Sequence, residues 1–215
     1  MPNRRTVLAL AASAAGMALL RARLALAQRS GSSPVRVMRE DPVVTRIEFD
    51  PRRPPPDMPP LTPPEAGVCK STYELSAGVN YSAARLSRTA ARIYVDELDI
   101  VTRLRFDIYT QQGAPPKLRA HEEGHRAIGE HYYLDAAAIA QGIGMRLIGT
   151  EHDGNGADQE AAQQDAFNKV VAAIEQAYMA RVRTPSAAAN ARFDELTRHG
   201  LDPIEEAEAI ARSVA

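Results

Sequence analysis

The sequence contains no tryptophan and a single cysteine, Cys69, in 215 residues. One cysteine cannot form a disulfide within the chain or supply a four-cysteine metal site. Aromatic residues are also scarce, with seven tyrosines and four phenylalanines, so aliphatic side chains and alanine must form most of the core. Basic residues are not in excess, because 26 lysines and arginines stand against 27 acidic residues. This balance argues against a protein that binds nucleic acid through its charge.

The first 27 residues predict a twin-arginine-type signal peptide. They contain four arginines and no acidic residue, and the segment from Asn3 to Leu8 resembles the twin-arginine export signal. The alanine-rich apolar stretch over 7–20 and the small residues Ala25 and Ala27 predict export with cleavage before Gln28. An uncleaved membrane anchor is the alternative, but the stretch is shorter than the roughly 18 residues that a span needs. We therefore expect a periplasmic or secreted protein with no membrane span after signal removal.

Residues 28–66 form a segment that is rich in proline. It holds ten prolines, several of them adjacent, as in 54–56, 59–60 and 63–64. Proline lacks a backbone N–H and favours extended polyproline geometry, so we interpret the segment as a solvated linker. Within it, the alternation over Val43–Phe49 predicts a short strand.

Residues 67–215 predict one α+β domain, in which a short antiparallel sheet precedes a helical part. Apolar and polar residues alternate from Leu98 to Ile108, which is typical of a half-buried strand. After Pro116 the apolar spacing becomes helical. Helices are expected over 117–141, 158–182 and 186–198, the last ending at Gly200, and a final helix is expected from Asp202-Pro203.

One sequence motif indicates a metal-binding site. Residues 121–125 read His-Glu-Glu-Gly-His, an HExxH pattern. On a helix the two histidines lie about 40° apart on one face, where His121 and His125 can bind one tetrahedral Zn²⁺. Glu122 lies at the edge of that face, where it can accept a proton from a metal-bound water. Gly124 would allow another element to approach the metal closely.

A catalytic zinc needs a third protein ligand, and the sequence offers several. His131 follows His121 by ten residues, the spacing of the metzincin motif, but Ile128 stands where that motif has its glycine. If the helix continues, His131 points away from the pair. A polar loop over 151–153 could swing over the metal, and His199 is the remaining candidate.

Two stretches together resemble a known family. The HExxH pattern and a late segment, Phe193 to Gly200, resemble HEQGH and YDxxTxHG, the motifs of bacterial domain-of-unknown-function family number 922. Here Glu123 replaces the glutamine and Phe193 replaces the tyrosine. The resemblance covers about residues 70–210. It implies an exported zinc-dependent protease of zincin-like fold, with His199 as the favoured third ligand. His131, which the spacing alone suggests, stays as the alternative.

The sequence therefore predicts an exported zinc metallopeptidase that hydrolyses peptide bonds with a zinc-activated water. His121, His125 and His199 are expected to bind zinc, with Glu122 as general base. Glu130 and Asp194 are candidates for orienting the ligand imidazoles. The alternative is a non-catalytic zinc-binding or zincin-fold protein that binds partners in the cell envelope. We expect a protein or peptide substrate and, because no second apolar stripe follows the helix over 158–182, a monomer.

Overall fold

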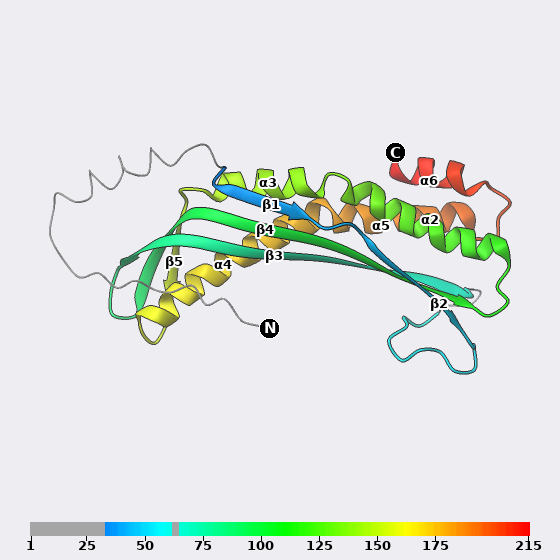
Figure 1. Ribbon diagram of the computed structural model, residues 1–215, viewed down its shortest axis with the longest axis horizontal. Coiled ribbons are helices and arrows are strands. Elements are labelled where there is room, and N and C mark those ends of the chain that lie inside the picture. Colours follow the sequence, from blue (N-terminus) through cyan, green and yellow to red (C-terminus); the bar gives the residue numbers. More distant parts are fainter. Residues whose placement is uncertain (1–32, 62–64) are drawn as a thin grey trace. The chain divides into compact units, whose positions relative to one another are not determined.

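The computed structural model describes residues 33–61 and 65–215, and the predicted signal peptide lies outside them. Residues 34–215 form one compact unit. In the described part of the chain, no helix is long and apolar enough to cross a bilayer. The unit combines one sheet with a set of helices, as the α+β class requires (Figure 1).

The sheet is organised around one long central strand. Strand β4 (Ala90–Gln111) pairs antiparallel with β3 (Gly67–Arg85) along almost its whole length, from Ala91 opposite Arg85 to Thr110 opposite Gly67. The other edge of β4 binds three short strands in succession. These are β5 (Glu151–Asn155), which is antiparallel, and β1 (Val35–Arg39) and β2 (Val43–Phe49), which are parallel.

The sheet corrects three predictions. The segment interpreted as a linker contributes β1 as well as the predicted strand β2, so the compact unit begins at Pro34 rather than at residue 67. The sheet is mixed instead of purely antiparallel, and its two main strands are long, because β3 has 19 residues and β4 has 22. The residues expected to form a mobile polar loop, 151–153, belong to β5, where Arg92 pairs with Glu151 and Asp153.

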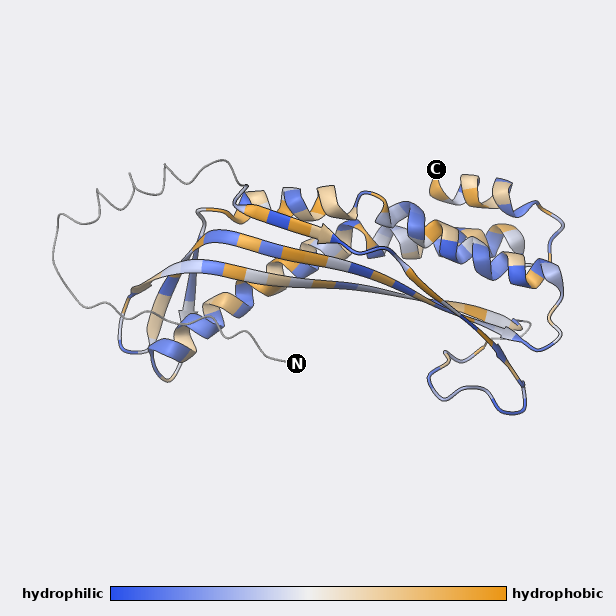
Figure 2. Ribbon diagram, viewed as in Figure 1, coloured by the Kyte–Doolittle hydropathy of each residue, from blue (hydrophilic) through white to orange (hydrophobic). Residues whose placement is uncertain are grey.

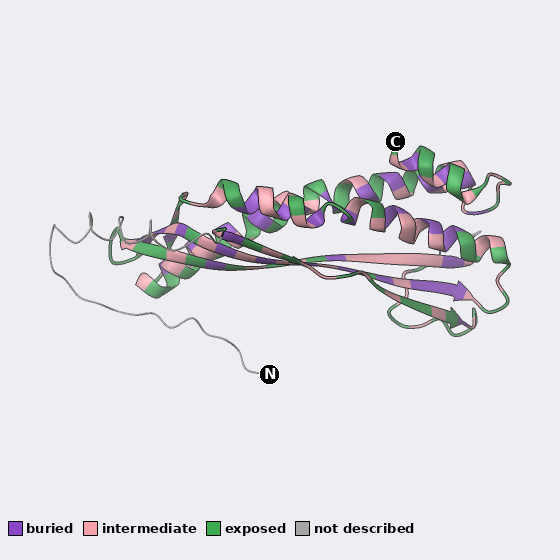
Figure 3. Ribbon diagram, turned by 45° about the horizontal axis from the view of Figure 1, so that its top comes forward, coloured by how far each residue is buried: buried purple, intermediate pink, exposed green. Residues whose placement is uncertain are grey.

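Five helices follow β4 in the described chain and cover one face of the sheet (Figures 1 and 3). They are α2 (Pro116–Tyr133), α3 (Ala136–Leu147), α4 (Gln159–Arg181), α5 (Arg183–Thr197) and α6 (Glu206–Val214). Helices α2 and α4 pack directly on β3 and β4, and α6 packs on α2 and α5. The expected single helix over 117–141 is interrupted at Leu134 and Asp135, and the last helix begins after Glu205 instead of at Asp202.

The core lies between the sheet and the helices. The alternation along β4 places Leu98, Ile100, Leu104, Phe106 and Ile108 on the helix-facing side, where each is at most 3 % exposed. Figure 2 shows this alternation as changing colour along β4. Helix α4 completes the layer with buried residues at every fourth position: Ala162, Ala166, Val170, Ile174 and Tyr178. The apolar residues of β4, spaced by two, and those of α4, spaced by four, therefore form one buried layer.

Candidate metal centre

Helices α2 and α5 approach each other through a glycine. A Cβ atom at Gly124 would lie 2.8 Å from the Phe193 Cε1 atom, so only glycine lets the Phe193 ring rest on α2. The ring stacks on the His121 imidazole, with centroids 4.9 Å apart, and meets the His125 ring edge-on at 5.1 Å. The close approach that the sequence predicted at Gly124 is confirmed, and it brings the following residue of α5, Asp194, to the two histidines.

This contact predicts the effect of a small substitution. Gly124→Ala should lower the free energy of unfolding by about 1–3 kcal/mol, because overlap with Phe193 outweighs the roughly 1 kcal/mol that alanine normally gains in a helix. Gly142→Ala on α3 is the matched control, since the nearest atom to its Cβ would be Arg146 Nη1 at 3.8 Å. Urea unfolding of both variants measures the difference. A stabilised Gly124→Ala protein would contradict the packing described here.

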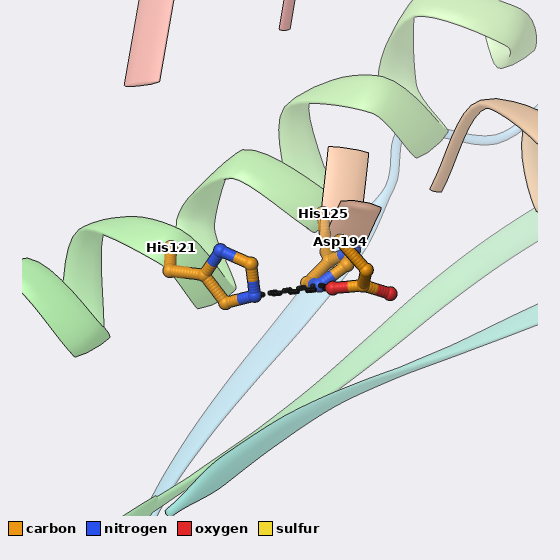
Figure 4. Close-up of side chains that lie close together, drawn as sticks. All are labelled: His121, His125 and Asp194. Carbon is orange, nitrogen blue, oxygen red and sulfur yellow. Dashed lines mark hydrogen bonds and ion pairs between the residues drawn. The ribbon is translucent and has the colours of Figure 1, made fainter. Parts of the chain in front are cut away.

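Three side-chain atoms converge on one point between α2 and α5 (Figure 4). The Nε2 atoms of His121 and His125 are 3.1 Å apart. Asp194 Oδ1 lies 3.2 Å from the first and 3.0 Å from the second. The His121 side chain is 3 % exposed, that of His125 14 % and that of Asp194 29 %. The group is therefore buried at His121 and partly accessible to solvent at Asp194.

The opposite ring nitrogens are held by hydrogen-bond acceptors. His125 Nδ1 lies 2.7 Å from Asn190 Oδ1, and the Asn190 amide is fixed in turn by donating to the Ser186 carbonyl at 2.9 Å. His121 Nδ1 lies 3.3 Å from the Thr197 hydroxyl, which donates its own proton to the Phe193 carbonyl. Both imidazoles are therefore set to carry a proton on Nδ1 and to present a lone pair on Nε2.

Three acceptor atoms in contact repel one another unless a cation or shared protons lie between them. In the absence of a metal, shared protons relieve this repulsion. Burial alone would lower the pKa of His125, but Asp194, with help from Glu122 and Asn190, outweighs burial and raises it. Burial likewise opposes ionisation of Asp194, yet the two histidines hold its pKa below the usual range. For His121, burial prevails and lowers the pKa.

The donor set suits a divalent transition metal. Ligands of a tetrahedral Zn²⁺ at about 2.0–2.1 Å stand about 3.3 Å from one another. The three observed separations, 3.0 to 3.2 Å, are close to this value. Two imidazole nitrogens and one carboxylate oxygen form a combination that zinc accepts, and it leaves a fourth position open. Among the described residues, His121, His125 and Asp194 are the one group of His, Cys, Asp and Glu side chains that lie close enough together to bind a metal.

Glu122 lies beside this group on the buried side of α2. Its side chain is 3 % exposed, and it lines the same cleft as His121 and His125. The backbone N–H of Cys69 on β3 hydrogen-bonds the carboxylate, while Oε2 has no hydrogen-bond partner among the described residues. Burial, with smaller effects from neighbouring acidic groups, raises the pKa of Glu122 to about 7. A carboxylate that exchanges a proton near neutral pH is suited to act as a base.

The raised pKa has a consequence for stability. Because the ordinary pKa is 4.5 and the folded-state value about 7, the unfolded chain ionises first and stability is lost as the pH rises through this interval. In metal-free protein, Glu122→Gln should therefore raise the free energy of unfolding at pH 8 by a few kcal/mol at most, on the order of 3, and by much less at pH 5. Urea unfolding with chelator at both pH values measures this. Equal differences at the two pH values would contradict it.

The predicted third ligand, His199, lies at the edge of the group instead of inside it. Its Nδ1 atom is 3.6 Å from Asp194 Oδ1 and 3.3 Å from Glu65 Oε1, and 43 % of its side chain is exposed. Helix α5 ends here in three left-handed residues, Arg198 at φ 47°, His199 at φ 56° and Gly200 at φ 77°. This turn carries His199 off the helix face that holds Asp194.

The other candidates lie elsewhere. His131 is exposed on α2 and contacts the ring of Tyr132, as expected because α2 continues past the motif to Tyr133. His152 is on β5 and hydrogen-bonds to Thr150. Glu130, a candidate for orienting the imidazoles, pairs with Arg126 instead. Asn190 was missed, although its place four residues before Asp194 puts both on one face of α5.

His121, His125 and Asp194 line a cleft of about 320 Å³. One wall is the first part of β3, from Gly67 to Tyr73, and the other is the face of α5 that runs from Arg183 to Asp194. Glu65 and His199 lie where β3 begins and α5 ends. No family model, curated protein or solved structure matches this chain.

Proposed function

We propose that the protein is a zinc-dependent metallopeptidase of zincin-like fold. One observation carries the proposal: His121 Nε2, His125 Nε2 and Asp194 Oδ1 form a triangle with sides of 3.0 to 3.2 Å, with Glu122 buried beside it in one cleft. Zinc in such a site supplies Lewis acidity and a bound water whose pKa falls to about 7. The family resemblance of the two motifs, and export to the periplasm or medium, belong to the same proposal.

The roles follow from the contacts. His121, His125 and Asp194 would hold the metal, so the proposal replaces His199 by Asp194 as third ligand. Glu122, buried beside them in the same cleft, would accept the proton of the attacking water and pass it to the leaving amine. Asn190 and Thr197 keep the two imidazoles in the ligand tautomer, through the contacts of 2.7 Å and 3.3 Å described above.

The cleft wall suits an extended peptide. Among the described strands, β3 pairs with β4 alone, so its other edge leaves backbone N–H and C=O groups for a peptide along the cleft, apart from the Cys69 N–H that binds Glu122. A peptide that adds to such an edge is held by main-chain hydrogen bonds, whatever its side chains. The substrate of the proposed reaction is accordingly a protein or peptide segment without regular structure.

Metal analysis and a cleavage assay test the proposal together. Purified mature protein should contain one zinc per chain and cleave fluorescein-labelled casein. Chelation should stop cleavage, and added zinc should restore it. A protein that binds no metal at neutral pH would overturn the whole proposal.

One observation favours a second function, that of a non-catalytic zinc-binding protein. The Glu122 carboxylate accepts a hydrogen bond from the Cys69 backbone and is 3 % exposed, so its role can be to anchor α2 on β3. In that case zinc is bound with no cleavage of casein, and Glu122→Gln changes only stability. The cleft would then bind a protein partner in the cell envelope.

A further inference from the structure

The cleft contains one permanent positive charge. Of the described residues that line it, Arg183 is the one lysine or arginine, and the acidic residues are Glu65, Glu122 and Asp194. The Arg183 side chain is exposed, and no hydrogen bond or ion pair joins it to the described part of the chain. A guanidinium presents a planar fork of N–H donors at its edge, which matches the two oxygens of a carboxylate.

Arg183 lies on the same helix, α5, as the candidate ligand Asp194 and as Asn190, which contacts His125. Arg183 begins α5, and Ala187, Asn190 and Asp194 follow at helical spacings of four, seven and eleven residues, so all four lie on one face. All four line the cleft. At 1.5 Å per residue, Arg183 stands about 10 Å along the helix from Asn190 and about 16 Å from Asp194.

We propose that Arg183 binds a carboxylate of the substrate, three to five residues from the bond that is cut. This inference rests on the proposed peptidase function and adds a substrate class to it. An extended chain advances about 3.3 Å per residue, so the 10–16 Å from Arg183 to Asn190, which contacts His125, and to Asp194 correspond to about three to five residues. The carboxylate is either an acidic side chain or the C-terminus of the peptide.

Binding of peptides to a variant that does not cleave them tests the role of Arg183. The probes are fluorescein-labelled decapeptides of one sequence, with a single Glu or Gln moved through the positions and with a free or amidated C-terminus. Anisotropy is measured on zinc-loaded Glu122→Gln protein. A Glu or a free C-terminus at the favoured position should tighten binding about tenfold over its neutral counterpart. Whether Glu or the free terminus gives the effect identifies the source of the carboxylate.

The variants assign the effect to Arg183. Adding Arg183→Ala should abolish the preference for a carboxylate, and Arg183→Lys should keep part of it. Arg181→Ala is the control, because Arg181 is exposed at the end of α4 and does not line the cleft. The proposal is overturned if neutral and acidic peptides bind equally well, if none binds, or if the preference survives in Arg183→Ala.

Wild-type cleavage separates this inference from the function on which it rests. Cleavage of casein without any preference for acidic peptides overturns the role of Arg183 and leaves the peptidase standing. A carboxylate preference lost in Arg183→Ala, in a protein that cleaves nothing, supports carboxylate binding and refutes the peptidase.

Discussion

Asp194→Ala is expected to abolish stoichiometric zinc binding, with the zinc affinity falling by more than about 100-fold. The reason is that Asp194 Oδ1 is the third corner of the ligand triangle and its single negative charge. Two imidazoles remain in the variant, and they fall short of the three protein ligands that zinc sites of this kind use. Metal content after dialysis against a zinc buffer measures the loss.

His199→Ala is the decisive comparison, because His199 was the ligand predicted from the sequence. Its Nδ1 atom is 3.6 Å from Asp194 Oδ1, outside the converging group, so the variant should retain one zinc per chain. His131→Ala, on the exposed side of α2, should retain it too. Zinc lost from His199→Ala and kept in Asp194→Ala would show that the ligand assignment from the structure is wrong.

Glu122→Gln is expected to keep zinc and to reduce cleavage by about 10²- to 10⁴-fold, the usual contribution of a general base. Glutamine has nearly the shape of glutamate and can still accept the hydrogen bond from the Cys69 backbone, so the fold should be unchanged. The amide cannot take a proton from water. Initial rates on labelled casein, with metal content measured on the same sample, give the effect.

Two results would contradict this role for Glu122. Full cleavage by a zinc-loaded Glu122→Gln protein would mean that another group takes the proton. Loss of zinc together with activity would mean that Glu122 supports the ligands instead of the reaction. Glu123→Gln is the matched control, because Glu123 stands next in the motif but pairs with Arg46 and Arg126 on the outer side of α2.

The sequence predicted the parts of the site that depend on one helix. Spacing alone places His121 and His125 on a common face, and the structure confirms that their Nε2 atoms meet. Helical spacing could not predict the third member of the group, because it comes from another helix. Asp194 and His199 are five residues apart, and the choice between them depends on a left-handed turn at the end of α5 that moves His199 aside.

The high proline content of residues 28–66 led the sequence analysis to miss strand β1. Prolines are frequent between residues 34 and 60, but Pro34 and Pro42 lie just outside β1 and β2, and Pro51 follows β2, where no ladder hydrogen bond is lost. Five-residue β1 has too little alternation to be recognised by itself. Its partner on β4 lies about 60 residues later in the chain, so only the folded register reveals it.

The parallel pairing of β1 and β2 has a practical consequence for any shortened form of this protein. A chain that begins at residue 67 would leave the β4 backbone from Leu98 to Gln111 without the neighbours that β1 and β2 provide. Such a bare, long strand edge is a template for intermolecular pairing and aggregation. Recombinant expression should therefore retain the chain from Pro34 onward, however dispensable its prolines make that stretch look.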